Sequence, residues 1–261
     1  MSKLYRILAL FVIVMTVAFC AAPTAVQIAP SPTSQPDLPA LPEVSISRHP
    51  QPADFSSYYV KLTSIPIYDL NSDDPFQIDL RSRDLTSIDM TNSLSDLMYA
   101  TFDSKTKWPA PGMMSAAFDP YKILELNKDP GLGVRNLHQQ GIDGTGIGIA
   151  IIDQTLLVDH IEYKDRIRVY EEAEDIGKDW TATMHGAAVT SIAAGKTVGI
   201  APNADLYYIA TENCGDATSM EDLDFSCRAK AIHRIVEINR GLPDNRKIRV
   251  LSMSFGWDRK V

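Results

Sequence analysis

The chain contains little cysteine and no apolar stretch of membrane-spanning length. Its 261 residues include 3 cysteines, too few for a small fold held together by several disulfides. The 14 glycines and 16 prolines exclude a collagen-like repeat. A basic excess is also missing, because 33 acidic side chains outnumber 25 basic ones. We therefore expect a globular protein, with one large domain or two small ones, and no nucleic acid as its partner.

The N-terminus has the layout of an export signal. Lys3 and Arg6 precede an apolar run at residues 7–19, which is shorter than the roughly 20 residues that a membrane span requires. The following Cys20 ends a Val-Ala-Phe-Cys sequence that resembles a bacterial lipobox, so Cys20 is a candidate for lipidation. Plain secretion is the alternative. We predict a signal at residues 1–22, a proline-rich tether at 23–47, and an extracellular or cell-surface location, with membrane attachment if Cys20 is acylated.

Residues 48–130 show less regular patterning. An Asp followed by Leu or Met recurs every five residues, at Asp79-Leu80, Asp84-Leu85 and Asp89-Met90. This recurrence faintly resembles a pentapeptide-repeat coil. Repeat folds need several stacked copies to bury a core, so a polar segment with incidental spacing is the preferred interpretation.

From residue 131 onward, predicted strands and helices alternate. Three apolar segments predict buried strands, and they end at Asp153, Ala210 and Met253. Helices are expected at residues 132–140, at 185–194, and from Ser219 to Gly241. This alternation predicts an α/β fold with a mainly parallel sheet.

Two residues in this segment could carry chemistry. Asp153 stands at the carboxyl end of a buried strand, where reactive groups of parallel sheets collect, and a carboxylate there needs a hydrogen-bonding partner. His185 opens a helix 32 positions later, where a neutral imidazole can act as a base. Each also has an ordinary explanation, because aspartates often cap loops and histidines often lie on surfaces.

Five ordered blocks closely resemble the first half of a subtilisin-like serine protease (subtilase) catalytic domain. They are Gly146–Asp153, His160–Glu162, His185–Val189, Val198–Ala204 and Leu251–Gly256, and the resemblance covers residues 131–261. It implies a subtilisin-like three-layer fold and hydrolysis of protein or peptide substrates without a catalytic cofactor. Asp153 would orient the base and His185 would be the general base and acid. The substrate-pairing strand would be Ser252, Met253, Ser254, Phe255 and Gly256.

The sequence departs from the subtilase pattern at several points. Gln154-Thr155 follows Asp153 where the family usually has Ser or Thr and then Gly, and Ala187 replaces the usual threonine after His-Gly. A Gly-Thr-Ser nucleophile motif does not occur after His185, and the strand with the oxyanion asparagine is not reached. We therefore expect a truncated catalytic domain that is inactive by itself. The alternative is an inactive exported peptide-binding or surface lipoprotein remnant.

Other site types are less consistent with the sequence. The glycines at 144, 146 and 148 precede their strand, whereas a dinucleotide site requires them after it. The histidines are scattered, so a zinc hydrolase is disfavoured and no metal site is predicted; calcium binding stays open. Cys214 and Cys227 are predicted to form a disulfide, because an exported chain whose Cys20 is removed or acylated keeps this even pair.

Overall fold

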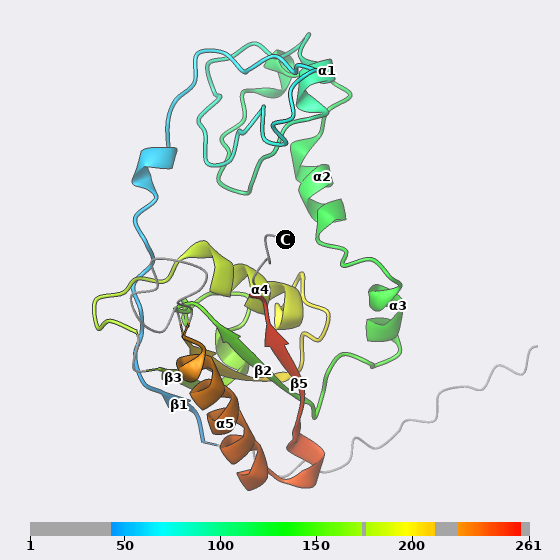
Figure 1. The fold of residues 1–261 in the computed structure, drawn as a ribbon. Coiled ribbons are helices and arrows are strands. Elements are labelled where there is room, and N and C mark those ends of the chain that lie inside the picture. Colours follow the sequence, from blue (N-terminus) through cyan, green and yellow to red (C-terminus); the bar gives the residue numbers. More distant parts are fainter. Residues whose placement is uncertain (1–42, 174–175, 212–223, 257–261) are drawn as a thin grey trace, which may run out of the picture. The chain divides into compact units, whose positions relative to one another are not determined.

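The structure is a computed structural model that describes residues 43–173, 176–211 and 224–256. A five-stranded sheet with order β1-β3-β4-β2-β5 organises the C-terminal part, and every neighbouring pair is parallel (Figure 1). The predicted α/β fold with a parallel sheet is thus confirmed. The strands are β1 (Ser45–Ile46), β2 (Gly148–Asp153), β3 (Ile167–Glu172), β4 (Asp205–Ala210) and β5 (Ile248–Met253).

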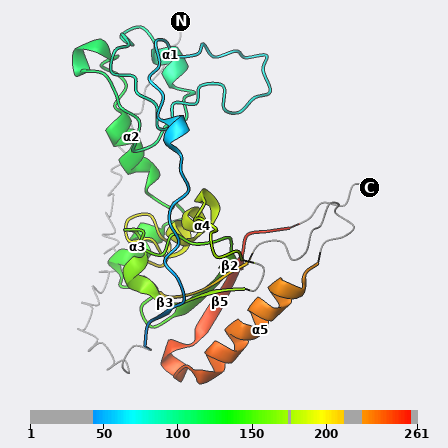
Figure 2. The ribbon, with the colours of Figure 1, turned by 90° about the vertical axis from the view of Figure 1, so that its left-hand side faces the viewer.

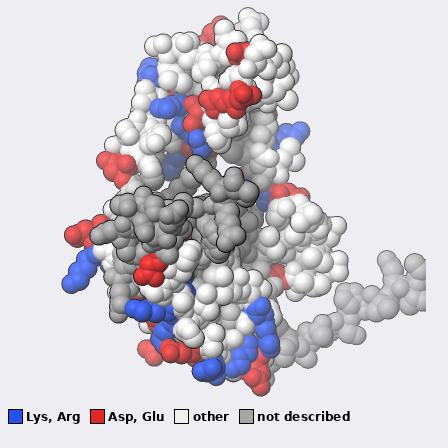
Figure 3. Space-filling view, viewed as in Figure 1, with Lys and Arg blue, Asp and Glu red and all other residues white. Residues whose placement is uncertain are grey.

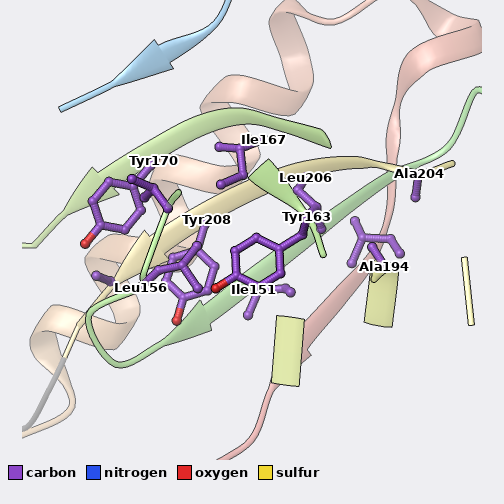
Figure 4. Packing of buried hydrophobic residues seen from close by; sticks show 12 residues of the cluster. Ile151, Leu156, Tyr163, Ile167, Tyr170, Ala194, Ala204, Leu206 and Tyr208 are labelled. Atoms are coloured by element: carbon purple, nitrogen blue, oxygen red, sulfur yellow. The ribbon is translucent and has the colours of Figure 1, made fainter. Parts of the chain in front are cut away.

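Helices cover both faces of this sheet, which gives three layers. On one face, helix α4 (Met184–Ala194) packs with Ile151 and Tyr208. On the other face, helix α5 (Ser226–Gly241) packs with Ile152 and Tyr207. Neighbouring residues of a strand point to opposite faces, so continuous apolar strands serve both cores. Figure 2 shows the two helices on opposite sides of the sheet, and Figure 4 shows the aromatic packing of the α4 side.

The predicted elements differ from the structure mainly at their ends. The strands ending at Asp153, Ala210 and Met253 are present, and the helix expected from residue 185 begins one residue earlier. The long helix begins at Ser226 within the described residues, and its predicted cap, Ser219, lies outside them. Strand β1 lies within the segment predicted as a tether, and it pairs with β3. The sequence analysis does not predict β3. The remaining helices are α1 (Leu94–Leu97), α2 (Pro120–Asn127) and α3 (Val134–Gln139), with 3-10 turns at Ser56–Tyr58, Pro111–Met113, Lys164–Arg166 and Asp244–Arg246.

A buried ion cluster holds the amino ends of the strands together. Asp205 is fully buried at the start of β4, and its two carboxylate oxygens accept from Arg168 Nε at 2.8 Å and Arg246 Nη1 at 2.9 Å. Both arginines are themselves buried. Burial raises the pKa of the adjacent Tyr207 to about 12, and the Asp205 charge adds to that rise. The cluster connects β3, β4 and the 3-10 turn Asp244–Arg246 that precedes β5, at the sheet end opposite Asp153.

Residues 55–118 form a coil with a core of its own. Parallel bridges join Lys61 to Asp84, Asp84 to Lys107, Asp79 to Thr101 and Met90 to Met114, so bridged residues are 22 to 24 positions apart. The backbone N–H two residues after each recurring aspartate donates to its carboxylate, at 3.1 Å for Asp79, 3.1 Å for Asp84 and 3.0 Å for Asp89. The Leu or Met after each aspartate is completely buried.

The five-residue recurrence therefore marks turns that aim successive apolar side chains inward. The interpretation as incidental spacing is wrong, because a polar segment would not bury Leu80, Leu85 and Met90. The coil repeat of 22 to 24 residues is longer than five, since each coil contains several such turns.

Within the described residues, no helix combines the length and apolarity needed to cross a membrane. Acidic and basic side chains are interspersed over the face shown in Figure 3.

Candidate active site

Asp153 is the last residue of β2, a strand whose six residues are all buried. This strand lies between β4 and β5, and Asp153 pairs with Ala210. The side chain is 2% exposed. A carboxylate in such a position is costly unless it receives hydrogen bonds, so its partners define its role.

His185 supplies the main partner of this carboxylate. It is the second residue of α4, and its Nδ1 lies 2.7 Å from Asp153 Oδ1. An ionised carboxylate can only accept, so with Asp153 ionised Nδ1 donates this bond, and a neutral imidazole then has its lone pair at Nε2. The imidazole is 47% exposed, in contrast to the buried carboxylate. The pair thus combines a fixed acceptor with a base that substrate or a nucleophile can reach.

Gly186 allows the helix to come this close to the sheet. A Cβ at this position would lie 2.5 Å from Tyr208 Oη and 3.0 Å from the Gln154 carbonyl oxygen, far inside ordinary contact. The Tyr208 hydroxyl itself donates to that carbonyl at 2.5 Å. Glycine is therefore needed for close packing of α4 against the turn that follows β2.

The remaining hydrogen-bonding capacity of Asp153 is used unevenly. Oδ1 also accepts from the backbone N–H of Gln154 at 2.8 Å. Oδ2 is buried without a hydrogen-bond partner among the described residues, as is the hydroxyl of Thr155 in the same turn. Among the described residues, Oδ1 thus makes the hydrogen bonds of this carboxylate to both the imidazole and the turn.

Comparison with known proteins agrees with this geometry. The sequence model of the subtilase family matches residues 144–261, the segment that contains β2, α4, β4, α5 and β5. These residues form a subtilase-family domain. A search of curated proteins found no match.

The predicted substrate strand of this subtilase domain begins in the last two residues of β5, next to the end of β2. Ser252 and Met253 are the last residues of β5, where Met253 pairs with Ile152, and Ser254, Phe255 and Gly256 follow. Among the described strands β5 pairs only with β2, so its other edge carries no strand there. The Phe255 ring packs with the α5-side core, and the Arg228 guanidinium lies 4.3 Å from its centroid.

The cysteine predictions reach partly outside the described residues. Cys227, buried in the first turn of α5, is disulfide-bonded. Cys214 and Cys20 both lie outside the described residues, so the Cys214–Cys227 pairing and the lipidation of Cys20 stay predictions. In the described part of the chain, no group of three or more His, Cys, Asp or Glu side chains is arranged to hold a metal ion.

Sequence reasoning missed three residues that build the site. Gln154 was noted only as a departure from the family pattern, and neither Thr183 nor Tyr208 was singled out. Thr183 Oγ1 donates to Gln154 Oε1 at 2.7 Å. The one available signal was the unusual Gln-Thr sequence after Asp153, which requires a turn with different contacts.

Proposed function

We propose that the domain is the acid–base half of a subtilisin-like serine endopeptidase. The observation that carries this proposal is the 2.7 Å contact between His185 Nδ1 and Asp153 Oδ1 within a subtilase-family segment. In this role His185 Nε2 takes the proton of a serine hydroxyl as its oxygen attacks the scissile carbonyl carbon. His185 then gives that proton to the leaving amine, while Asp153 stays ionised and stabilises the imidazolium.

The serine nucleophile belongs, in this proposal, to residues that the 261-residue sequence does not contain. The sequence has no Gly-Thr-Ser motif after His185. Among the described residues, no serine hydroxyl donates to His185. An extended peptide would pair with the open edge of β5 at Ser252–Gly256, as substrates do at exposed strands. The 261-residue chain alone is then inactive.

The decisive experiment compares the 261-residue chain with an extended chain that includes a downstream Gly-Thr-Ser motif. Each is incubated with a fluorophosphonate probe and with casein. We expect labelling and proteolysis only in the extended chain, and their loss in Asp153→Ala and His185→Ala. His233→Ala, at an exposed position of α5, is the matched control and should retain activity.

Two results would contradict the proposal. Labelling of the 261-residue chain that His185→Ala abolishes would show that the nucleophile lies within it. A folded extended chain that binds peptides but is never labelled would favour the inactive peptide-binding remnant.

We also propose that the chain is exported. The support is the charged start, the apolar run at residues 7–19 and the proline-rich segment that follows. Mature protein should begin at or near residues 20–23, and intact Met1 on protein from the medium or cell surface would refute export. Incorporation of a labelled fatty acid, lost in Cys20→Ala, would identify the lipid-anchored form.

A further inference from the structure

The threonine that begins helix α4 does not cap it. Thr183 occupies the N-cap position with extended backbone angles (φ −93°, ψ −171°), but its side chain makes no capping hydrogen bond. Threonine at this position usually accepts from a backbone N–H of the first turn, which stabilises the helix. Here the hydroxyl instead donates to Gln154 Oε1 at 2.7 Å. The helix start is thus bonded to the turn that follows β2.

Gln154 uses three of its polar groups to connect different parts of the site. Its backbone N–H donates to Asp153 Oδ1 at 2.8 Å, and its carbonyl accepts from the Tyr208 hydroxyl of β4 at 2.5 Å. Its side-chain oxygen accepts from Thr183. Gln154 is therefore bonded to the end of β2, to β4 and to the residue that precedes α4. A serine or threonine, which the family usually has at this position, is two or more atoms shorter than this side chain.

The two side-chain bonds between the turn and the helix act as a pair. Asp153 holds His185, and the next residue, Gln154, holds Thr183, two residues before the histidine. A single hydrogen bond leaves its partners free to rotate about the bond axis. A second bond between neighbouring residues restrains the helix start relative to the turn, while the close packing at Gly186 sets the separation.

We propose that Gln154 and Thr183 are positioning residues that keep the His185 imidazole in the Nδ1–H tautomer facing Asp153. This inference rests on the proposed role of His185 as the base, because only that tautomer leaves Nε2 free to accept a proton. The bond between Thr183 and Gln154 is exposed to solvent, so it contributes to orientation more than to overall stability.

The test is nitrogen-15 NMR of histidine-labelled 261-residue chain at about pH 8.5, where histidine side chains are ordinarily neutral. The His185 signals are assigned by their loss in His185→Ala. We expect one predominant Nδ1–H form in the unaltered chain. Thr183→Val and Gln154→Met keep side-chain size but remove the donor or the acceptor. Each should raise the ratio of the Nε2–H to the Nδ1–H form about two- to tenfold, the range that one net hydrogen bond spans.

Two variants separate positioning from a general structural effect. Thr183→Ser keeps the hydroxyl and should restore the spectrum of the unaltered chain. Thr145→Val removes an exposed threonine bond of the same length, 2.7 Å to Asp143, before the amino end of β2 and thus at the other end of that strand from Asp153, and should leave the His185 signals unchanged. The double variant of Gln154 and Thr183 should shift the ratio no further than either single change, because both remove the same bond.

The outcomes distinguish this inference from the function on which it rests. An unaltered chain with an Nδ1–H imidazole whose tautomer ratio is the same in folded Thr183→Val and Gln154→Met overturns the positioning role alone. An unaltered, folded chain whose His185 is not protonated at Nδ1 overturns both the positioning role and the acid–base pair. If one variant does not fold by circular dichroism, the other and Thr183→Ser still decide the question.

Discussion

Replacement of Gly186 by alanine should separate the histidine from the aspartate. The new Cβ would lie 2.5 Å from Tyr208 Oη and 3.0 Å from the Gln154 carbonyl. Tyr208 is 1% exposed and its hydroxyl is hydrogen-bonded, so it has little room to move away. Helix α4 must therefore shift outward, and the 2.7 Å contact of His185 with Asp153 lengthens with it.

The expected cost follows from three contributions. Overpacking costs about 1–3 kcal/mol, and loss of the His185–Asp153 hydrogen bond about 1 kcal/mol more. Alanine recovers about 0.5–1 kcal/mol because it favours helix over glycine. Gly186→Ala should thus lower the free energy of unfolding by about 1–3.5 kcal/mol in urea titrations followed by circular dichroism.

A matched glycine and a second-site change test the reason for that loss. Gly241 ends α5 and a Cβ there would meet no atom within 4 Å, so Gly241→Ala should not destabilise the protein. Tyr208→Phe added to Gly186→Ala removes the closest atom and should recover part of the stability. A Gly186→Ala protein as stable as Gly241→Ala, with an unchanged His185 imidazole spectrum, would refute this reasoning.

Three further predictions concern charge and buried polar atoms. Asp205→Asn should lower the free energy of unfolding in urea by about 3–5 kcal/mol, because it leaves two buried guanidinium groups without their carboxylate. Glu237→Gln, at an exposed ion pair, should change it by almost nothing. Burial opposes ionisation of Asp103, but hydrogen bonds from three neighbouring residues hold the pKa of its carboxyl below its usual range. A lowered native pKa stabilises the fold at pH values above the unfolded-state pKa of about 3.9, and this contribution is lost as the pH falls through the native pKa. Unfolding midpoints should therefore decline in acid less steeply for Asp103→Asn than for the unaltered chain. Thr155→Val should be neutral or stabilising by up to about 1 kcal/mol, because the buried hydroxyl has no hydrogen-bond partner among the described residues. Thr190→Val removes a buried 2.7 Å hydrogen bond and should destabilise the protein. Equal losses of stability in calorimetry would contradict this.

The strands that could be predicted from sequence are those that consist almost entirely of apolar residues. β2 and β4 are apolar on both faces, so a continuous run identifies them. β3 could not be identified this way because it contains Arg168, Glu171 and Glu172. Each of these charges is neutralised by a residue distant in the chain, which makes the strand tolerable only in the folded structure.

The positions of the site residues follow the same division. Asp153 and His185 could be found because their local sequences place one at a strand end and the other at a helix start. Their contact could be expected only from the order of motifs that resembles the subtilases. The bond between Gln154 and Thr183 joins an exposed side chain to a half-buried one 29 residues away, and no local pattern predicts such a pair.

In the proposed function, Asp153 and His185 have different requirements, and each lies on a different kind of secondary structure. A buried carboxylate stays ionised only if it receives hydrogen bonds, and at the end of the central strand β2 the backbone N–H of Gln154 and the imidazole of His185 supply them to Asp153. A base that must exchange protons has to be reachable, and the first turn of a helix provides that for the 47%-exposed imidazole. The exposed partner is therefore the one whose orientation solvent can disturb. In the proposed function, the contacts that restrain the helix start, at Gly186, Thr183 and Gln154, would determine whether Nε2 faces the nucleophile.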